Sequence, residues 1–178
     1  TVSANIAISL AMKGYKVILV DADLRNPSTA KVLGMQEQEL GTLQVLKGEV
    51  KIEDAVQPYK DTSVMVLAGS SPIQDTSTVL SGENMRQFIK ELEAKADFVV
   101  IDTPPSAMLS DAAIVAQYVD GAVFVIRQDY TEADRILEGM EILSSSGAQI
   151  TGCILNDANV KGNSSEHYKN SYRLKGEV

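Results

Sequence analysis

The most constraining stretch of the sequence is a short apolar run that leads directly into two acids. Residues 17–20 read Val-Ile-Leu-Val, and Asp21, Ala22 and Asp23 follow them. Four consecutive apolar residues, mostly β-branched, predict a strand buried on both faces, as in a parallel sheet. Because side chains alternate along a strand, Asp21 and Asp23 point to the same side if the extended geometry continues. Ligands of open α/β sheets bind beyond the carboxyl ends of the strands. The stretch therefore predicts a Mg²⁺ or phosphoryl-transfer site; the alternative is a polar strand exit with a solvated Asp and a helix cap.

Further apolar runs alternate with helical patterns along the chain. Strands are expected at 64–67, 98–101, 122–126 and 150–155. The clearest helical spacing lies at 85–92, where Ser81 is placed to cap the helix. A second helix carries Leu137 on its apolar face and opens near Thr131 with a pattern similar to a capping box, whereas the helix at 1–13 begins without a preceding cap. This alternation predicts an α/β fold with a parallel sheet covered on both faces.

The composition is that of a globular chain of one ordinary domain. The 178 residues are 44% hydrophobic and 22% charged, with a formal net charge of −8. That balance argues against broad binding to nucleic acid or anionic lipid, so we expect no nucleic acid partner. His167 is the only histidine, which argues against histidine metal sites and Ser-His-Asp triads. Cys153, the only cysteine, lies in an apolar run and is expected to be buried and reduced, as in a cytoplasmic chain.

A third acid stands at the end of another predicted strand. The run 98–101 is followed by Asp102, Thr103 and two prolines, which force the chain out of the sheet. Carboxylate oxygens gathered at the carboxyl ends of strands suit Mg²⁺, which would bridge nucleotide phosphates. A strand that ends in Asp is the pattern of the second magnesium-site motif of P-loop NTPases. The two acidic exits together predict a nucleotide-dependent phosphoryl-transfer site.

Several stretches resemble, in order, those of the bacterial tyrosine kinases of polysaccharide synthesis. Residues 17–27, which end in Asp-Ala-Asp-Leu-Arg-Asn-Pro, are similar to the Walker A′ motif of that family, and residues 98–105 to its Walker B motif. Residues 67–72 match the loop between them, and residues 120–127 and the closing strand also follow the family. The resemblance spans nearly the whole chain. It identifies the chain as a member of the deviant P-loop ATPases, with the ParA-like and MinD-like proteins.

The resemblance implies both a fold and an activity. The implied fold is a three-layer α/β/α P-loop NTPase-like domain with a mainly parallel sheet, comprising a core at 1–157 and a flexible tyrosine-containing tail at 158–178. The implied activity is that of an ATP-dependent protein-tyrosine autokinase with ATP and Mg²⁺ as cofactors, which regulates polysaccharide polymerisation and export. The alternatives are a ParA- or MinD-like ATPase without kinase activity and an inactive interaction fragment. The implied partners are a neighbouring copy of the chain and the cytoplasmic segment of a membrane polysaccharide co-polymerase, which would recruit this cytoplasmic protein to the inner face of the membrane.

The same resemblance suggests roles for the three acids. Asp21 would contact or deprotonate the incoming tyrosine hydroxyl, while Asp23 and Asp102 would organise Mg²⁺. The sequence does not decide which of Asp21 and Asp23 acts as the base and which binds the metal. Because an ordinary Asp is a weak base at neutral pH, positioning and charge neutralisation are expected to supply most of the rate.

The resemblance also implies nucleotide contacts and phosphate acceptors. Thr1 would be the first helical residue after the phosphate loop, and Asn156 would lie near adenine, unless it only serves as a turn residue. Arg25 would stabilise phosphate charge or an intersubunit contact, with a surface ion pair as the alternative. Tyr168 and Tyr172 would be phosphorylated by a neighbouring subunit; the alternative is a plain disordered tail.

The glycine-rich phosphate loop of P-loop proteins does not occur in this sequence. Gly-x-x-x-x-Gly-Lys-[Ser/Thr] is absent from the 178 residues, and residues 1–7 resemble the segment that follows it. We therefore expect the natural protein to have a first strand and a phosphate loop before Thr1. Without them, two strands of the sheet would have open edges, ATP binding would be weak and kinase activity negligible.

Overall fold

The computed structural model describes residues 1–106 and 110–159. Its helices are α1 (Val2–Ala11), α2 (Thr29–Leu33), α3 (Thr42–Leu46), α4 (Ile52–Ala55), α5 (Glu83–Glu93), α6 (Asp111–Val115), the 3₁₀ helix η1 (Ala116–Tyr118) and α7 (Ala133–Ser145). Its strands are β1 (Val17–Asp21), β2 (Gln57–Pro58), β3 (Val64–Leu67), β4 (Phe98–Asp102), β5 (Ala122–Arg127) and β6 (Ile150–Asn156). Among these residues, no helix is long and apolar enough to cross a membrane.

The larger sheet is built around β1. Its strand order is β2-β3-β1-β4, and β1 runs parallel to both β3 and β4, whereas the short β2 is antiparallel to β3. All five residues of β1 are buried, as its unbroken apolar run predicts. In the register of β1 and β4, Asp21 lies directly opposite Asp102. The central strand therefore brings the two acidic exits together.

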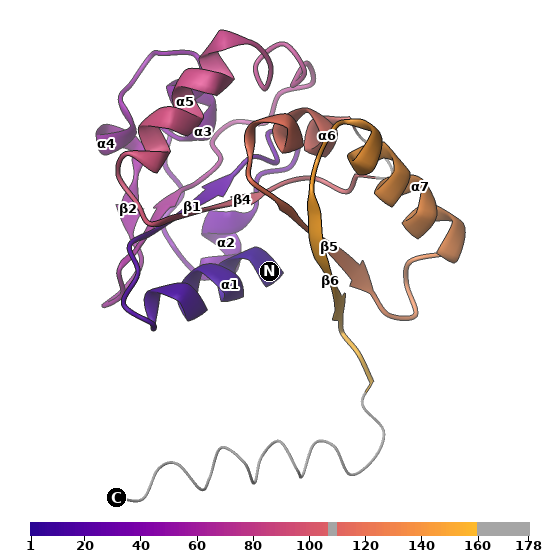
Figure 1. Ribbon diagram of the computed structural model, residues 1–178. Coiled ribbons are helices and arrows are strands. Elements are labelled where there is room, and N and C mark those ends of the chain that lie inside the picture. Colours follow the sequence, from indigo (N-terminus) through magenta and orange to yellow (C-terminus); the bar gives the residue numbers. More distant parts are fainter. Residues whose placement is uncertain (107–109, 160–178) are drawn as a thin grey trace, which may run out of the picture.

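Helices cover both faces of this sheet, which gives the three layers expected of the fold. Figure 1 shows α3 and α5 on one face and α1 and α2 on the other. Alternate residues of β1 point into the two layers: Ile18 belongs to a core cluster with residues of α3, α4 and α5, and Leu19 to a cluster with residues of α1 and α2. The α/β class and the mainly parallel pairing are confirmed.

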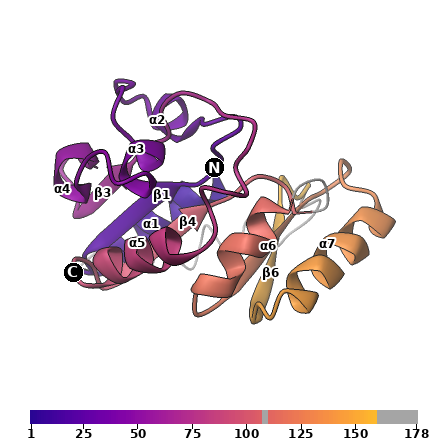
Figure 2. The ribbon, with the colours of Figure 1, turned by 90° about the horizontal axis from the view of Figure 1, so that it is seen from above.

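The remaining two strands form a separate sheet. β5 and β6 pair with each other in parallel and not with β4. Within the described ranges, β4 and β5 each keep one unpaired edge. Their side chains are correspondingly less buried than those of β1, with Phe98 and Val125 41% and 44% exposed. Figure 2 shows α6 between α5 and α7, and the contacts of η1 with α5 and of α6 with α7 join the two parts.

Several details differ from the sequence-based expectations. Helix α1 is capped, because the Thr1 hydroxyl accepts a hydrogen bond from the Ala4 N–H at 3.4 Å. Ser81 does not cap α5, whose N-cap is Gly82, and the capping box at Thr131 does not form because α7 begins one residue later, after Glu132. Cys153 is exposed rather than buried. The reason is its place on β6, which pairs on one side only and is covered by little of the described chain.

Candidate active site

The first acid, Asp21, is enclosed by the backbone of the loop that follows it. Its side chain is only 1% exposed. One carboxylate oxygen accepts a hydrogen bond from the N–H of Asp23 at 3.1 Å, and the other accepts from Ser28 and Thr29 at 3.0 and 2.9 Å. Asp21 therefore fixes the loop 22–28 and the start of α2, in addition to any chemical role.

The second acid, Asp23, is more accessible. It is half-buried, and its Oδ1 accepts hydrogen bonds from the N–H groups of Arg25 at 3.2 Å and Asn26 at 2.9 Å. Its Oδ2 accepts no hydrogen bond from the residues that the structure describes. Asp23 thus has a carboxylate oxygen free for a metal ion, a water molecule or a substrate hydroxyl.

The third acid, Asp102, receives a short hydrogen bond from the first turn of α1. The Ser3 hydroxyl donates to Asp102 Oδ1 at 2.5 Å. Burial raises the pKa of Asp102, and the negative charges of Asp21 and Asp23 raise it further, while the Ser3 hydrogen bond acts in the opposite direction. The three acids therefore lie close enough to repel one another, which is the electrostatic condition that a bound cation relieves.

The oxygen atoms at these strand exits match the ligand preference of Mg²⁺. Within residues 1–106 and 110–159, no group of three or more Asp, Glu, His or Cys side chains is arranged to hold a metal ion by itself. Asp23 and Asp102, together with the Ser3 hydroxyl that is bonded to Asp102, nevertheless offer hard oxygen atoms only. Mg²⁺ usually takes one or two carboxylates, and waters and substrate phosphates complete its shell. The residues present fit that pattern.

A glycine loop closes the acidic site from the side of β3. A Cβ built on Gly69 would lie 2.2 Å from Pro27 Cβ and 3.4 Å from Asp21 Oδ2, so only glycine fits there. The neighbouring Ser70 donates to the side chain of Gln44 at 2.7 Å. In the structure, this Gly-Ser-Ser-Pro loop packs against the loop that carries Asp23.

The Arg25 guanidinium forms hydrogen bonds with other residues of the chain. Its guanidinium donates to Asp111 Oδ2 at 2.8 Å, to Asp111 Oδ1 at 3.2 Å, to the Thr76 hydroxyl at 2.7 Å and to the Gln74 carbonyl at 2.8 Å. The hydrogen bond with Asp111 is the main reason that the pKa of Arg25 is raised. A guanidinium has five N–H donors, so these bonds leave one for a ligand. The ion pair with Asp111 was not specifically expected from the sequence, because the two residues are 86 positions apart.

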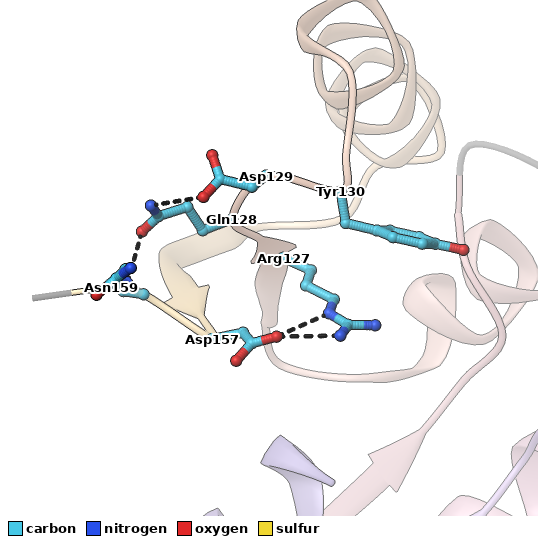
Figure 3. A pocket seen from close by; sticks show the side chains of 7 residues that line it. Arg127, Gln128, Asp129, Tyr130, Asp157 and Asn159 are labelled. Carbon is cyan, nitrogen blue, oxygen red and sulfur yellow. Dashed lines mark hydrogen bonds and ion pairs between the residues drawn. The ribbon is translucent and has the colours of Figure 1, made fainter.

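A pocket lies where β5 and β6 end. Its volume is about 510 Å³, and Figure 3 shows the side chains that line it: Arg127, Gln128, Asp129, Tyr130, Asp157 and Asn159. Arg127 forms an ion pair with Asp157 at 3.0 Å and lies 5.1 Å from the centre of the Tyr130 ring. Asn156 immediately precedes Asp157, and its carbonyl accepts the N–H of Gln128 at 3.0 Å. The predicted adenine contact therefore lies at the rim of this pocket.

The structure brings some of the predicted site residues together and leaves others apart. Thr1, Asp21, Asp23 and Asp102 gather at the acidic exits, whereas Asn156 lies at the end of the separate β5–β6 sheet. Tyr168 and Tyr172 lie outside the described residues. Thr76 and Asp111 were not recognised from the sequence as part of the site, because only their packing reveals them.

Comparisons with known proteins agree with this geometry. A model of the ParA family, described as NUBPL iron-transfer P-loop NTPase, matches residues 1–177. MinD of Pyrococcus horikoshii, solved with Mg-ADP, shares the fold with a TM-score of 0.72 at 24% identity over 94% of this chain and 70% of that chain. The fold and the acidic strand exits thus define a P-loop NTPase of the ParA and MinD class.

Similar proteins show to which group of P-loop NTPases the chain belongs. Tyrosine-protein kinase YwqD of Bacillus subtilis (strain 168) is 32% identical over 168 residues, which cover 94% of this chain and 70% of the relative. The kinase domain of the Escherichia coli tyrosine kinase ETK superposes with a TM-score of 0.84 at 28% identity, over 91% of this chain and 63% of that domain. The chain belongs to the bacterial tyrosine kinases, as the motifs at 17–27 and 98–105 indicate.

Proposed function

We propose that the chain transfers the γ-phosphoryl group of Mg²⁺-ATP to tyrosines of a neighbouring copy and thereby regulates capsule or exopolysaccharide synthesis. The observation that carries this proposal is the meeting of three acids at the exits of β1 and β4, with Asp21 opposite Asp102 in register. Membership of the tyrosine kinases supplies the reaction class. The geometry supports different roles for the three acids.

Asp23 and Asp102 would hold Mg²⁺, which when bound neutralises phosphate charge during transfer. The tyrosine oxygen attacks the γ-phosphorus while the bond to the leaving ADP oxygen breaks, and a carboxylate accepts the phenolic proton. Both oxygens of Asp21 already accept backbone N–H groups, whereas Asp23 Oδ2 accepts none among the described residues. This supports Asp23 as the carboxylate that meets metal or substrate, and Asp21 as the group that holds the loop and adds negative charge.

The nucleotide would extend from the acidic exits to the end of the second sheet. Thr1 and Ser3 begin the helix beside Asp102, where phosphates would lie. Asn156 and the adjoining pocket of about 510 Å³ would accommodate the base. The open edges of β4 and β5 support a further strand between them, which would lead into α1 and carry the phosphate loop; residues 1–157 would then form the rest of one kinase core.

Residues 158–178 would be the tail that carries the acceptors. Tyr168 and Tyr172 are its two tyrosines, in a segment rich in polar residues. Activation by the cytoplasmic segment of a membrane polysaccharide co-polymerase, and recruitment of this cytoplasmic kinase to the membrane by that partner, follow from the family resemblance and belong to the same proposal.

A mixing experiment tests the direction of transfer. Full-length Asp23→Asn protein, with its tyrosines intact, is mixed with protein that carries Tyr168→Phe and Tyr172→Phe but is otherwise unchanged, and Mg²⁺-ATP is added. We expect phosphotyrosine on the Asp23→Asn chain at positions 168 and 172, found by mass spectrometry. The exposed Tyr15, which lies before β1 and away from the pocket, is the matched control when changed to Phe and should not alter the label. If wild type alone becomes labelled but the Asp23→Asn chain in the mixture carries label at neither position 168 nor position 172, transfer between subunits is contradicted.

A further inference from the structure

Three polar side chains link the two acidic exits without belonging to either. They are Arg25, Thr76 and Asp111, and we name them the Arg25 cluster. Asp111 is fully buried at the start of α6 and Thr76 is fully buried in the loop before α5, whereas the Arg25 side chain is 33% exposed. The Thr76 hydroxyl accepts from Arg25 at 2.7 Å and donates to Asp111 at 2.8 Å. Each of the three residues therefore contacts both others.

The cluster is directly connected to the first acidic exit. Arg25 lies two residues after Asp23, and its N–H donates to Asp23 Oδ1 at 3.2 Å. When the guanidinium is held, the backbone that bonds Asp23 is held with it. Because a buried carboxylate without a partner is strongly unfavourable, Asp111 keeps Arg25 in this place.

The cluster also includes the first helix that follows β4. Asp111 lies nine positions after Asp102 and begins the helix to which the chain from β4 leads. Arg25 thus ties the loop after β1 to the first helix after β4. Because pairing with β1 fixes Asp102, the position of the loop after β1 decides how far Asp23 lies from Asp102.

We propose that Arg25, Thr76 and Asp111 are positioning residues of the kinase reaction, which set the spacing of Asp23 and Asp102 and so the affinity of the site for Mg²⁺. This inference rests on the proposed function, because it takes Asp23 and Asp102 as the Mg²⁺ carboxylates. It assigns Arg25 an indirect role through Asp23, in place of direct contact with the nucleotide. Residues that hold metal ligands in place without touching the metal are important for binding. Their removal typically lowers metal affinity or activity by about 10–100-fold.

The test uses full-length protein with Thr76→Val, because valine keeps the shape of threonine and leaves the ion pair between Arg25 and Asp111 intact. We expect the Mg²⁺ concentration for half-maximal tyrosine phosphorylation to rise roughly tenfold. The KM for ATP at saturating Mg²⁺ and the affinity for ATP in EDTA should stay unchanged. Thr76→Ser keeps the hydroxyl and should restore the wild-type Mg²⁺ dependence. Thr78→Val, which removes an exposed hydroxyl bonded to Asp75, is the matched control.

Three further variants distinguish failure of this inference from failure of the proposed function. Arg25→Lys, compared with Arg135→Lys in an exposed ion pair of α7, should change the Mg²⁺ dependence as Thr76→Val does. If Arg25→Lys weakens ATP binding in EDTA, or if neither Thr76→Val nor Arg25→Lys changes the Mg²⁺ dependence, the positioning role is wrong. Asp23→Asn separates this failure from failure of the proposed function: unchanged Mg²⁺ dependence in Asp23→Asn overturns the metal assignment itself, whereas a change in Asp23→Asn alone overturns only the inference.

Discussion

At the scale of single residues, two carboxylates two positions apart have different surroundings. Asp21 is buried and accepts three backbone N–H groups, while Asp23 keeps one oxygen free of hydrogen bonds within the described chain. The sequence places both acids at the exit of β1 but cannot rank them, because alternation along a strand makes them equivalent. The turn of the loop back onto Asp21 distinguishes them.

The two Asp→Asn variants should therefore differ in their effect on stability. In Asp21→Asn, the amide NH₂ cannot accept a backbone N–H, so we expect a loss of about 1–3 kcal/mol in the free energy of unfolding as well as loss of activity. Asp23→Asn should keep near wild-type stability and lose activity roughly 10²-fold. Urea unfolding and tyrosine phosphorylation, measured on both proteins, check this. Equal destabilisation by the two variants would show that Asp21 has no special part in holding the loop.

Asp102 allows a prediction about pH. Its pKa in the folded protein is raised above that of an unfolded chain, which is about 3.9. The contribution of Asp102 to the free energy of unfolding is therefore fully present below the unfolded pKa, where the carboxyl is protonated. It is lost as the pH rises through the folded pKa. Asp102→Asn removes this loss, because it carries no charge at any pH and can still accept the Ser3 hydroxyl. Without Mg²⁺, we expect Asp102→Asn to be more stable than wild type at neutral pH.

The control for this prediction is the pH dependence itself. The difference in melting temperature between Asp102→Asn and wild type should shrink as the pH falls to about 3, where the carboxyl is protonated. Addition of Mg²⁺ and ATP should stabilise wild type more than the variant. A variant that is less stable than wild type at neutral pH would show that the acidic exits are not under electrostatic repulsion.

At the scale of elements, close packing of the loop after β3 shapes the site. Gly69 lies against Pro27 and beside Asp21, with no room for a side chain. Gly152 on β6 has open space where a Cβ would stand. The sequence places Gly69 in a loop and Gly152 in a strand, but neither pattern shows which segment packs beside the glycine.

Gly69→Ala should therefore disturb the acidic loop, whereas Gly152→Ala should not. Overpacking of this kind typically costs about 1–3 kcal/mol of stability, and displacement of catalytic groups by about 1 Å lowers rates by up to 10²-fold. Kinase rates and unfolding curves of the two alanine variants test the difference. Wild-type activity in Gly69→Ala would mean that the loop after β3 moves away from Pro27 without affecting Asp21 or Asp23.

Helices with similar apolar patterns also differ in how they pack. Leu92 on α5 is completely buried, while Leu137 on α7 is 65% exposed, although the sequence places both on apolar faces. Leu92→Ala should lower the free energy of unfolding by about 2–5 kcal/mol, and Leu137→Ala by no more than about 0.5 kcal/mol. Chemical denaturation of the two variants measures this. A large loss in Leu137→Ala would indicate that a segment outside the described residues covers α7.

At the scale of the whole molecule, the sequence predicted the individual strands better than the way in which they assemble. The strands at 17–20, 64–67 and 98–101 and the acidic exits were predicted from the sequence, because hydrophobic period and strand alternation are local properties. The exposure of Cys153 and the ion pair of Arg25 with Asp111 depend on contacts between distant segments. No local pattern encodes these.

The activity proposed for the acidic exits of β1 and β4 is tyrosine phosphorylation that depends on Mg²⁺ and ATP. Phosphotyrosine mass spectrometry of the full-length protein, incubated with ATP and either Mg²⁺ or EDTA, tests whether these exits carry it. We expect label on Tyr168 and Tyr172 with Mg²⁺, none with EDTA, and almost none in Asp23→Asn or Asp102→Asn. ATP hydrolysis by wild type without tyrosine label, or undiminished label in Asp23→Asn, would contradict this activity.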